Sequence, residues 1–341
     1  MTHPEIPLTR RAVLAWTAAL VPAMAQAQSP DPSAAPSAAP SVAPSAARLS
    51  TLSMFIPAGP GGGWDGLGRA IEQVARPAGL VGAMQFENVG GAGGTVGLPR
   101  FVAQRRGRGD ALMVAGSVMV GAVLTNRAPV GLKDVTPIAR LTQEVGVVVV
   151  PAQSDIRDIA GLLALMRANP GAVSVAGGSA GGTDHITLGL MLKALGRTAR
   201  EASYVAFAGG GPAQAAILGA QVRAGISGYS EFGEQIKSGR MRALATTGES
   251  RSDPAIPTLR ESGVDVVTAN WRGVFAPPGL RPEAREALTR FITALHALPA
   301  WHELLATRGW DDAFLAGAEF ERYLAADTAA TETVLKELGL A

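Results

Sequence analysis

The chain has 341 residues, enough for about two domains, and combines 47% apolar residues and 42 glycines with 5% aromatics and a formal net charge of +2. Its arginines are scattered rather than gathered in a basic run with interleaved aromatics, which argues against a nucleic-acid partner. The absence of cysteine excludes disulfides, thiolate metal sites and cysteine nucleophiles.

The first 27 residues have the pattern of an export signal. Arg10 and Arg11 precede an apolar run too short to span a bilayer, and small residues follow, so we expect cleavage near Ala25 or Ala27. The arginine pair resembles a twin-arginine signal, and an ordinary secretory signal fits the same residues. Residues 28–47 are almost entirely Ser, Pro and Ala, which predicts a disordered linker. The pattern therefore predicts a periplasmic protein.

Alternating strand and helix patterns begin at Leu49 and continue through the chain. Strands are expected at 49–57, 84–88, 111–116, 137–141, 145–150, 173–176, 202–207, 222–226, 241–246 and 271–276. Helices are expected at 65–76, 95–105, 156–168, 185–195, 212–218, 230–237, 283–297 and 319–338, and another begins within 119–124. This alternation predicts parallel sheets with helices on both faces.

Four of the expected strands run directly into a cluster of glycines and then into a helix. The clusters occupy 59–65, 90–95, 177–184 and 209–212. Glycine lets the backbone approach a ligand closely, and a helix N-terminus adds unpaired N–H groups and a partial positive charge. Because ligands of parallel sheets bind beyond the carboxyl ends of the strands, we expect the four clusters to hold a small anion between two lobes.

An ordered series of segments resembles the tripartite tricarboxylate transporter receptors, the Bug-type periplasmic binding proteins. The matching segments are 55–65, 87–97, 208–213, 236–245, 256–263 and 271–277, and the resemblance covers roughly residues 50–340. The Gly-Gly-Gly-Trp-Asp form at 61–65, together with 178–185, looks like the branch of this family that is named for tricarboxylates.

The resemblance implies an α/β, two-domain periplasmic-binding-protein fold of type II, a Venus flytrap. One lobe would comprise 48–146 plus 272–341 and the other 147–271, with crossing strands between them. We expect a monomeric receptor without catalytic activity or cofactor, because the four anion-cradling loops come without any nucleophile–base pair. It would bind a small di- or tricarboxylate such as citrate and pass it to the membrane permease subunits of a tripartite transporter. A receptor of the same fold that feeds a sensor kinase is an alternative.

The residues expected to face the ligand come from the loops that follow the strands. Main-chain amides would make most of the contacts, with loop hydroxyls and a few other side chains beside them. The expected ligand-binding set is Gly61, Gly62, Gly63, Trp64, Asp65, Ser117, Gly178, Ser179, Thr183, Asp184, His185, Gly209, Gly210 and Tyr229.

Several of these side chains also have a purely structural explanation. Asp65 opens a helix, which favours an N-cap over a ligand contact, while Trp64 either covers the ligand or packs between the lobes. One of the hydroxyls of Ser179 and Thr183 would cap the next helix. Arg272, on a presumed crossing strand, would pair with an acidic neighbour rather than with a ligand carboxylate.

Tyr229 and Ser230 follow a strand end, where Tyr229 could reach a ligand oxygen. Capping of the next helix by Ser230 and ordinary packing of Tyr229 explain the same residues. The histidines do not cluster in sequence, since His296 and His302 lie in the tail helices, and no metal site is expected.

An exported oxidoreductase is the competing function. The glycines at 61, 63 and 66 spell a dinucleotide fingerprint after a strand, and Glu87 stands where a ribose acceptor would lie. Two prolines stiffen this turn, and one fingerprint does not explain three further glycine clusters. Neither a P-loop lysine nor a Gly-x-Ser-x-Gly elbow is present, which argues against triphosphate hydrolysis and serine hydrolase chemistry.

Overall fold

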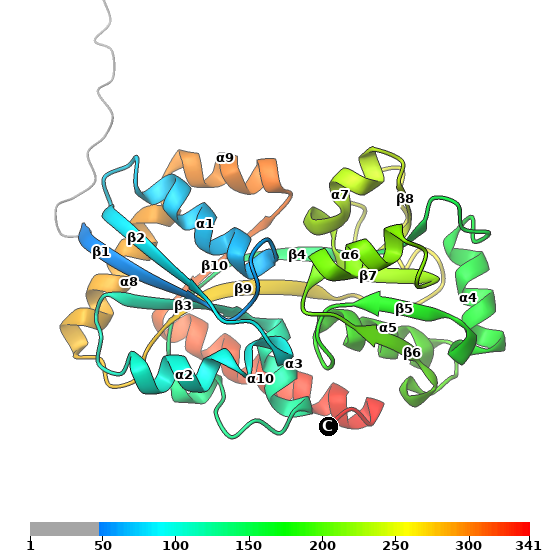
Figure 1. Cartoon of the computed structure of the whole chain (residues 1–341), viewed down its shortest axis with the longest axis horizontal. Coiled ribbons are helices and arrows are strands. Elements are labelled where there is room, and N and C mark those ends of the chain that lie inside the picture. Colours follow the sequence, from blue (N-terminus) through cyan, green and yellow to red (C-terminus); the bar gives the residue numbers. More distant parts are fainter. Residues whose placement is uncertain (1–47) are drawn as a thin grey trace, which may run out of the picture. The chain divides into compact units, whose positions relative to one another are not determined.

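Strands and helices alternate along residues 48–341, the part of the chain that the computed structural model describes (Figure 1). The expected export signal at 1–27 and the linker at 28–47 lie outside these residues. Within the described part, none of the helices combines the length and the hydrophobicity that a membrane crossing requires.

The first group of strands contains β1 (Leu49–Ile56), β2 (Val81–Asn88), β3 (Ala111–Gly116), β4 (Thr136–Pro151), β9 (Ala269–Ala276) and β10 (Asp311–Ala316). Their order is β2-β1-β3-β9-β4, and β10 pairs with β4. β1 is parallel to β2 and β3, whereas β9 is antiparallel to β3 and β4. The helices and 3₁₀ turns of this group are α1 (Gly63–Ala75), η2 (Ala92–Gly94), α2 (Gly97–Gln104), α3 (Ser117–Thr125), η3 (Leu132–Asp134), α8 (Pro282–His296), α9 (Pro299–Arg308) and α10 (Gly317–Leu338).

The second group of strands contains β5 (Ser174–Gly177), β6 (Ser203–Ala206), β7 (Ala224–Gly228) and β8 (Met241–Thr246). It continues from β4 in the order β4-β7-β5-β6, and β8 also pairs with β4. β5 is parallel to β6 and β7. Its helices and 3₁₀ turns are α4 (Ile159–Ala168), η4 (Pro170–Ala172), α5 (Thr183–Ala194), η5 (Ala199–Glu201), α6 (Gly210–Leu218) and α7 (Tyr229–Lys237).

β4 is one continuous strand of 16 residues, so the prediction of two strands at 137–141 and 145–150 was wrong. Its first part pairs with β9, and its valine run pairs with β7 and β8. The polar residues Thr142 and Glu144 interrupt the apolar pattern, so the sequence predicts a break between two strands there. Both are buried within the strand, and the burial of the Glu144 charge is possible because Arg272 on β9 pairs with it.

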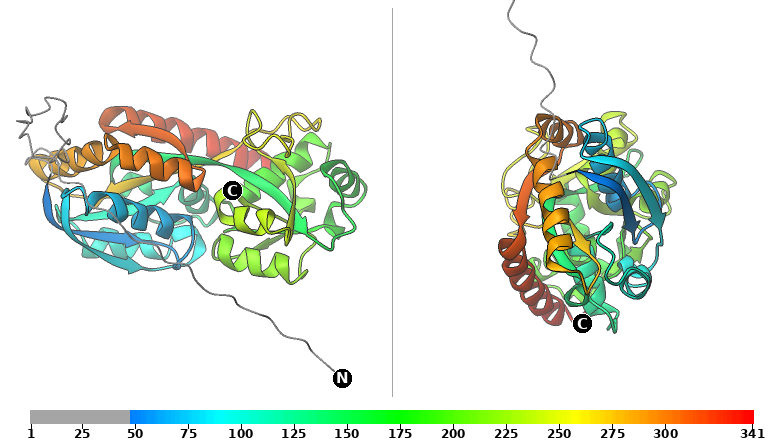
Figure 2. Two further views of the ribbon diagram at one scale, coloured as in Figure 1. Left: turned by 90° about the horizontal axis from the view of Figure 1, so that it is seen from above. Right: turned by 90° about the vertical axis from the view of Figure 1, so that its left-hand side faces the viewer.

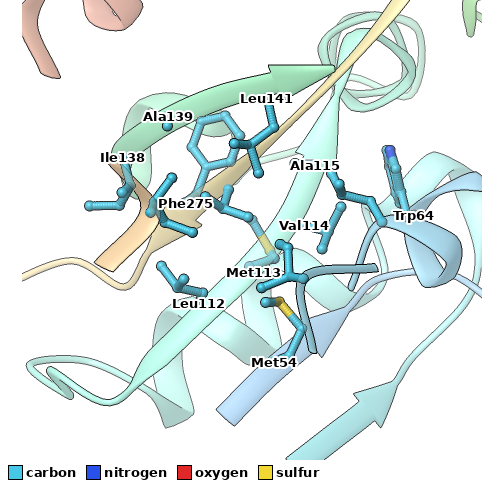
Figure 3. Close-up of a cluster of buried hydrophobic side chains, with 14 of the residues drawn as sticks. Met54, Trp64, Leu112, Met113, Val114, Ala115, Ile138, Ala139, Leu141 and Phe275 are labelled. Carbon is cyan, nitrogen blue, oxygen red and sulfur yellow. The ribbon is translucent and has the colours of Figure 1, made fainter. Parts of the chain in front are cut away.

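The apolar clusters divide along the chain. One joins residues between Leu52 and Leu141 to residues 271–324, and two others join residues within 147–266. In the first cluster every residue of β3 is buried, and Met113 of β3 lies among Met54 of β1 and Phe275 of β9 (Figure 3). A strand with neighbours on both edges and helices on both faces requires such a continuous apolar run.

The tail holds more structure than the two helices predicted for it. α8 and α10 match those predictions, but α9 and β10 lie between them and were missed. β10 is short, its register on β4 shifts within the strand, and its sequence begins with two aspartates, so it carries little strand signal. α10 packs against both α3 and α5 (Figure 2), so the C-terminal helix contacts elements of both strand groups.

The largest error in a predicted helix start is at α4, since the other expected starts differ from the observed ones by one or two residues. α4 begins at Ile159 rather than at 156, because Asp158 provides its N-cap and accepts a hydrogen bond from the Gly161 amide at 2.8 Å. Asp155, which stood near the predicted start, instead pairs with Arg223 at 3.1 Å.

A buried ion pair joins β4 to β9 at the centre of the fold. Glu144 and Arg272 are each 1% exposed and contact each other directly, which confirms the expectation that Arg272 pairs with an acidic neighbour. Ser230 of α7 also donates to Glu144. Within residues 48–341, Nη1 of Arg272 has no hydrogen-bond partner. The pair therefore fixes β9, β4 and α7 around one charge cluster.

Breaking this pair from one side should be costly. Arg272→Met is expected to lower the free energy of unfolding by about 3–5 kcal/mol, because it leaves the Glu144 carboxylate buried and unpaired. Glu144→Gln combined with Arg272→Met should lose less, since the Glu144 carboxylate is then no longer left buried and unpaired. Urea denaturation followed by tryptophan fluorescence measures both. A single variant as stable as the wild type would contradict this account.

Candidate functional site

All four glycine clusters reach one pocket. Its cavity has a volume of about 290 Å³ and is lined by the loop after β1 (57–64), the turn after β2 (91–94), the loop after β5 (178 and 179) and the loop after β6 (208–212). Val118, Asp184, Ser227, Glu231, Asn270 and Arg272 complete the wall. β1 with β2, and β5 with β6, are parallel neighbours, so their carboxyl ends bring two loops from each strand group to the same place.

The loop after β1 is shaped by a left-handed glycine and a buried carboxylate. Gly61 has φ +85°, and its amide donates to Asp65 at 3.0 Å. Asn88, at the end of β2, donates to the other oxygen of Asp65 at 3.0 Å. Burial raises the pKa of Asp65, but the hydrogen bonds from Gly61 and Asn88 outweigh it and hold the pKa below its ordinary value. Asp65 thus ties the loop to the neighbouring strand.

The prediction that Asp65 is an N-cap was wrong. The N-cap of α1 is Gly62, in extended backbone, and Asp65 is the third residue of the helix. Its carboxylate reaches back past the helix start to the loop amide of Gly61. The Asp65 carboxylate still lies in the first turn of α1, where the positive end of the helix dipole stabilises its negative charge.

The loop after β5 repeats this arrangement. The Gly178 amide donates to Asp184 at 2.8 Å, and the Gly181 amide donates to Nδ1 of His185 at 3.1 Å. The N-cap of α5 is Gly182 without a side-chain hydrogen bond, so the prediction of a capping hydroxyl was wrong. Thr183 instead donates to Ser117 at 3.4 Å. In both loops, a carboxylate from the following helix accepts a hydrogen bond from a loop amide, where the sequence suggested a helix cap.

His185 serves the loop rather than the pocket. Its ring stacks on Tyr204 with centroids 4.2 Å apart, and burial lowers its pKa, which favours the neutral imidazole. A neutral ring with Nδ1 accepting from Gly181 carries its proton on Nε2.

The structure brings together most of the residues expected to face a ligand. Those that line the pocket are Gly61, Gly62, Gly63, Trp64, Gly178, Ser179, Asp184, Gly209 and Gly210. Those that do not line it are Asp65, Ser117, Thr183, His185 and Tyr229. Trp64 borders the pocket and also belongs to the apolar cluster of Figure 3, which lies within the first strand group. Whether it covers a ligand or packs between lobes stays a prediction.

Tyr229 and Ser230 take other roles. The Tyr229 hydroxyl donates to Asp253, in the loop after β8, at 3.4 Å. α7 begins at Tyr229 behind the N-cap Gly228, so the suggestion that Ser230 caps it was wrong. Ser230 donates to Glu144 and accepts from Nε1 of Trp310 at 3.2 Å, and both contacts belong to the buried ion-pair cluster.

Three polar pocket residues were not among the expected ligand-binding residues: Ser227, Glu231 and Asn270. Glu231 lies in the first turn of α7, and its Oε1 accepts from the Gly63 amide at 2.9 Å. Asn270 lies on β9, and its Oδ1 accepts from Ser117 at 2.8 Å. The Ser-Gly-Tyr-Ser-Glu segment at the end of β7 was the only sequence signal for Glu231, and the sequence could not show that Glu231 reaches α1.

The pocket wall is acidic beside its glycine amides. Burial raises the pKa of Asp184 to about 7, with Glu231 and Glu144 adding to the effect and the Gly178 amide and Arg272 opposing it. Burial also raises the pKa of Glu231, against the opposing charge of Arg272. Three carboxylates therefore surround one guanidinium.

Two histidines meet outside this pocket. His296 of α8, His302 of α9 and Asp312 of β10 place their nitrogen and carboxylate atoms within 4.8 Å of one another. Their separation in sequence hid this group. Asp312 contacts Nε2 of His296 at 2.9 Å and accepts from the Phe314 amide at 3.1 Å, so this network explains its position.

Comparisons with known proteins identify the group to which this architecture belongs. Residues 73–340 match the family described as tripartite tricarboxylate transporter family receptor. Protein BugT of Bordetella pertussis is 29% identical over 265 residues, which cover 76% of this chain and 80% of BugT. A protein of Pseudomonas sp. from the tcbD-tcbE intergenic region is also 29% identical, with 76% and 77% of the two chains covered.

Solved structures share the fold. The periplasmic binding protein BugD has a TM-score of 0.76 at 22% identity, covering 85% of this chain and 98% of BugD. Rpa4515 of R. palustris, described with adipate, has a TM-score of 0.77 at 22% identity, with 85% and 97% covered. MatC of Rhodopseudomonas palustris, described with bound malate, has a TM-score of 0.66 at 22% identity, with the same coverage.

These similarities confirm the α/β periplasmic-binding-protein fold that was expected from the glycine-cluster segments. The family match extends over most of the described residues and includes elements of both strand groups. The chain belongs to the tripartite tricarboxylate transporter receptor family, the Bug-type periplasmic solute-binding proteins.

Proposed function

We propose that this protein is a periplasmic receptor that binds a small di- or tricarboxylate, such as citrate, and delivers it to the permease subunits of a tripartite transporter. The observation that carries the proposal is the meeting of four glycine turns, from four strand ends, around one cavity. The proposal includes removal of the export signal near Ala25 or Ala27, and action as a monomer. The malate and adipate of MatC and Rpa4515 support a carboxylate as the ligand class.

An anion in the pocket would meet hydrogen-bond donors that are distributed along the backbone rather than concentrated on side chains. α1 begins at Gly63 and α6 at Gly210, and both residues line the pocket. The first turn of a helix has amides without intrahelical partners and carries the positive end of its dipole. Several carboxylates spaced over a cavity of this size suit such distributed donors. Lysine is not among the lining residues, and Arg272 is already paired.

The proposal also requires the pocket to open. We infer that one lobe comprises 48–146 plus 272–341 and the other 147–271, and that they rotate about β4 and β9 near 147–150 and 271–274. The division of the apolar clusters between residues up to 141 and residues from 147 supports this inference. The contact between Gly63 and Glu231 would then form and break with closure.

The alternative of a dinucleotide-dependent oxidoreductase has little support in the same contacts. Glu87, expected as the ribose acceptor, is held by Arg105 at 2.6 Å and also pairs with Arg100. The Gly63 amide, which would face a pyrophosphate, donates to Glu231. A single fingerprint also leaves the other three glycine clusters in the pocket unexplained.

Carboxylates should stabilise the purified protein against heat. A ligand at a hundredfold excess over its Kd adds about 2.7 kcal/mol, which raises Tm by roughly 5 °C for a chain of this size. The panel should contain citrate, malate, succinate, adipate, a neutral sugar and NAD. Stabilisation by the sugar or by NAD, with none by any carboxylate, would contradict the proposed function.

Gly62→Val should abolish this stabilisation while leaving the free protein folded. Gly62 lines the pocket in extended backbone at φ −84° and ψ 176°, which valine adopts readily, and an added Cβ would meet only the Gly59 carbonyl oxygen, at 4.0 Å. The new side chain would occupy ligand space. Gly161→Val on α4 is the matched control, because its Cβ also makes ordinary contacts outside the pocket. Full carboxylate stabilisation in Gly62→Val would argue against this pocket.

The affinity for a di- or tricarboxylate should fall as pH rises through about 7. Asp184, whose pKa is raised to about 7, is largely neutral below that pH and becomes an anion on the pocket wall above it. Repulsion between this anion and the ligand means that binding takes up a proton. Calorimetric titrations between about pH 6 and about pH 8 should therefore show weakening in the wild type. Asp184→Asn should flatten the profile, and an equally steep profile in the variant would assign the effect elsewhere.

A further inference from the structure

The pocket contains more acidic groups than a general carboxylate site needs. Asp184, Glu231 and Arg272 line it, and Arg272 is engaged by Glu144 behind the wall. Asp184, Glu231 and Glu144 share this one guanidinium, so the pocket wall has more acidic groups than basic ones. A ligand with carboxylate groups alone would have to approach these groups against repulsion.

Glu231 is held in one position by contacts from three elements. Its Oε1 accepts from the Gly63 amide of α1 at 2.9 Å, and Ser227 of β7 donates to its Oε2. Gly210 of α6 lies so close to Oε2 that it leaves no room for a Cβ. The contact with Gly63 would form on closure, whereas Ser227 and Gly210 belong to the same proposed lobe as Glu231 and orient its carboxylate before a ligand binds. The remaining hydrogen-bonding capacity of this carboxylate is then open to a ligand.

That remaining capacity is for accepting hydrogen bonds. Each carboxylate oxygen has two lone pairs, and each oxygen of Glu231 uses one. Among residues 48–341, no further hydrogen bond to the Glu231 carboxylate is formed, since Gln214 donates to its main-chain oxygen and Arg272 donates to Glu144. The free lone pairs belong to a group that lines the pocket, so a ligand can reach them.

The opposite chemistry is present elsewhere in the wall. Asn270 lines the pocket, and its Oδ1 accepts from Ser117, which leaves its Nδ2 donor for the cavity. Together with the helix amides, Asn270 can hold a ligand carboxylate. The pocket therefore offers donors for carboxylates and, at Glu231, an acceptor for something else.

We propose that Glu231 is a specificity-determining residue that accepts a hydrogen bond from a hydroxyl or ammonium group of the ligand. The inference rests on the proposed function of carboxylate binding and narrows it to carboxylates that also carry such a donor. Hydroxy- and amino-substituted di- and tricarboxylates fit, and their unsubstituted counterparts leave the buried acceptor unpaired. A site built to hydrogen-bond a polar group rejects the analogue that lacks it.

Matched ligands that differ only in the donor test the inference. Calorimetry on the purified protein should compare citrate with propane-1,2,3-tricarboxylate, and malate and aspartate with succinate. We expect the donor-bearing acid of at least one pair to bind roughly 10- to 100-fold more tightly, as a hydrogen bond to a charged group implies. Malate and aspartate separate a hydroxyl from an ammonium donor.

Glu231→Gln and Glu234→Gln are the paired variants. Glu231→Gln keeps the shape and an acceptor for the Gly63 amide, while its NH₂ group replaces the second oxygen. It should reduce the preference to within about threefold and strengthen binding of the unsubstituted acid, a change of selectivity that a purely structural role would not produce. Glu234 lies on the same helix with an exposed side chain, so Glu234→Gln should keep the wild-type preference.

The outcomes separate the inference from the function on which it rests. Equal affinity within every pair in the wild type, or an unchanged preference in Glu231→Gln, would overturn the role of Glu231 and leave the receptor function standing. Failure of every carboxylate to bind would overturn the function itself. Each titration should be repeated with Mg²⁺ and with EDTA. If the preference appears only with Mg²⁺, a bound cation rather than Glu231 selects the ligand, and the inference fails.

Discussion

The fold depends on one shared strand and the ion pair buried beside it. The first part of β4 pairs with β9, and its valine run pairs with β7 and β8, so both strand groups include this one strand. Glu144 interrupts that strand with a charge, which is tolerable only because Arg272 on β9 contacts it directly. Ser230 connects α7 to the same carboxylate. The elements that carry the pocket are thus held at a fixed register around this pair.

The same cluster shapes the chemistry of the pocket. Because Arg272 is paired with Glu144, the attraction of the pocket for an anion comes mainly from backbone amides at helix starts. Resident carboxylates already accept from several amides of the glycine loops and helix starts, namely those of Gly61, Gly63 and Gly178. Each such contact rigidifies a glycine loop that would otherwise be conformationally free. The carboxylates therefore help to fix the loop conformations, and they also limit which ligands can bind.

The position of the pocket explains why glycine recurs there. The guanidinium of Arg272 lies so close to Gly63, and the carboxylate of Glu231 so close to Gly210, that no Cβ fits at either position. These two glycines serve close packing against charged groups and not a left-handed backbone, since positive φ occurs at other glycines of the clusters, namely Gly61, Gly91, Gly93, Gly94, Gly181 and Gly209. The clusters thus combine two different requirements for glycine in the same short loops.

Sequence by itself determined the alternation of strands and helices, the four glycine clusters and their place after strand ends, because these follow from local periodicity and backbone freedom. It also carried the family resemblance. The continuity of β4, the pairing of β10 and the caps Gly62 and Gly182 depended on the tertiary structure. Only the folded chain brings Glu231 to Gly63, which lies 168 residues away, because no local pattern encodes which helix start a carboxylate will meet. The charge balance of the pocket, and with it the selectivity proposed for Glu231, was decided at that level.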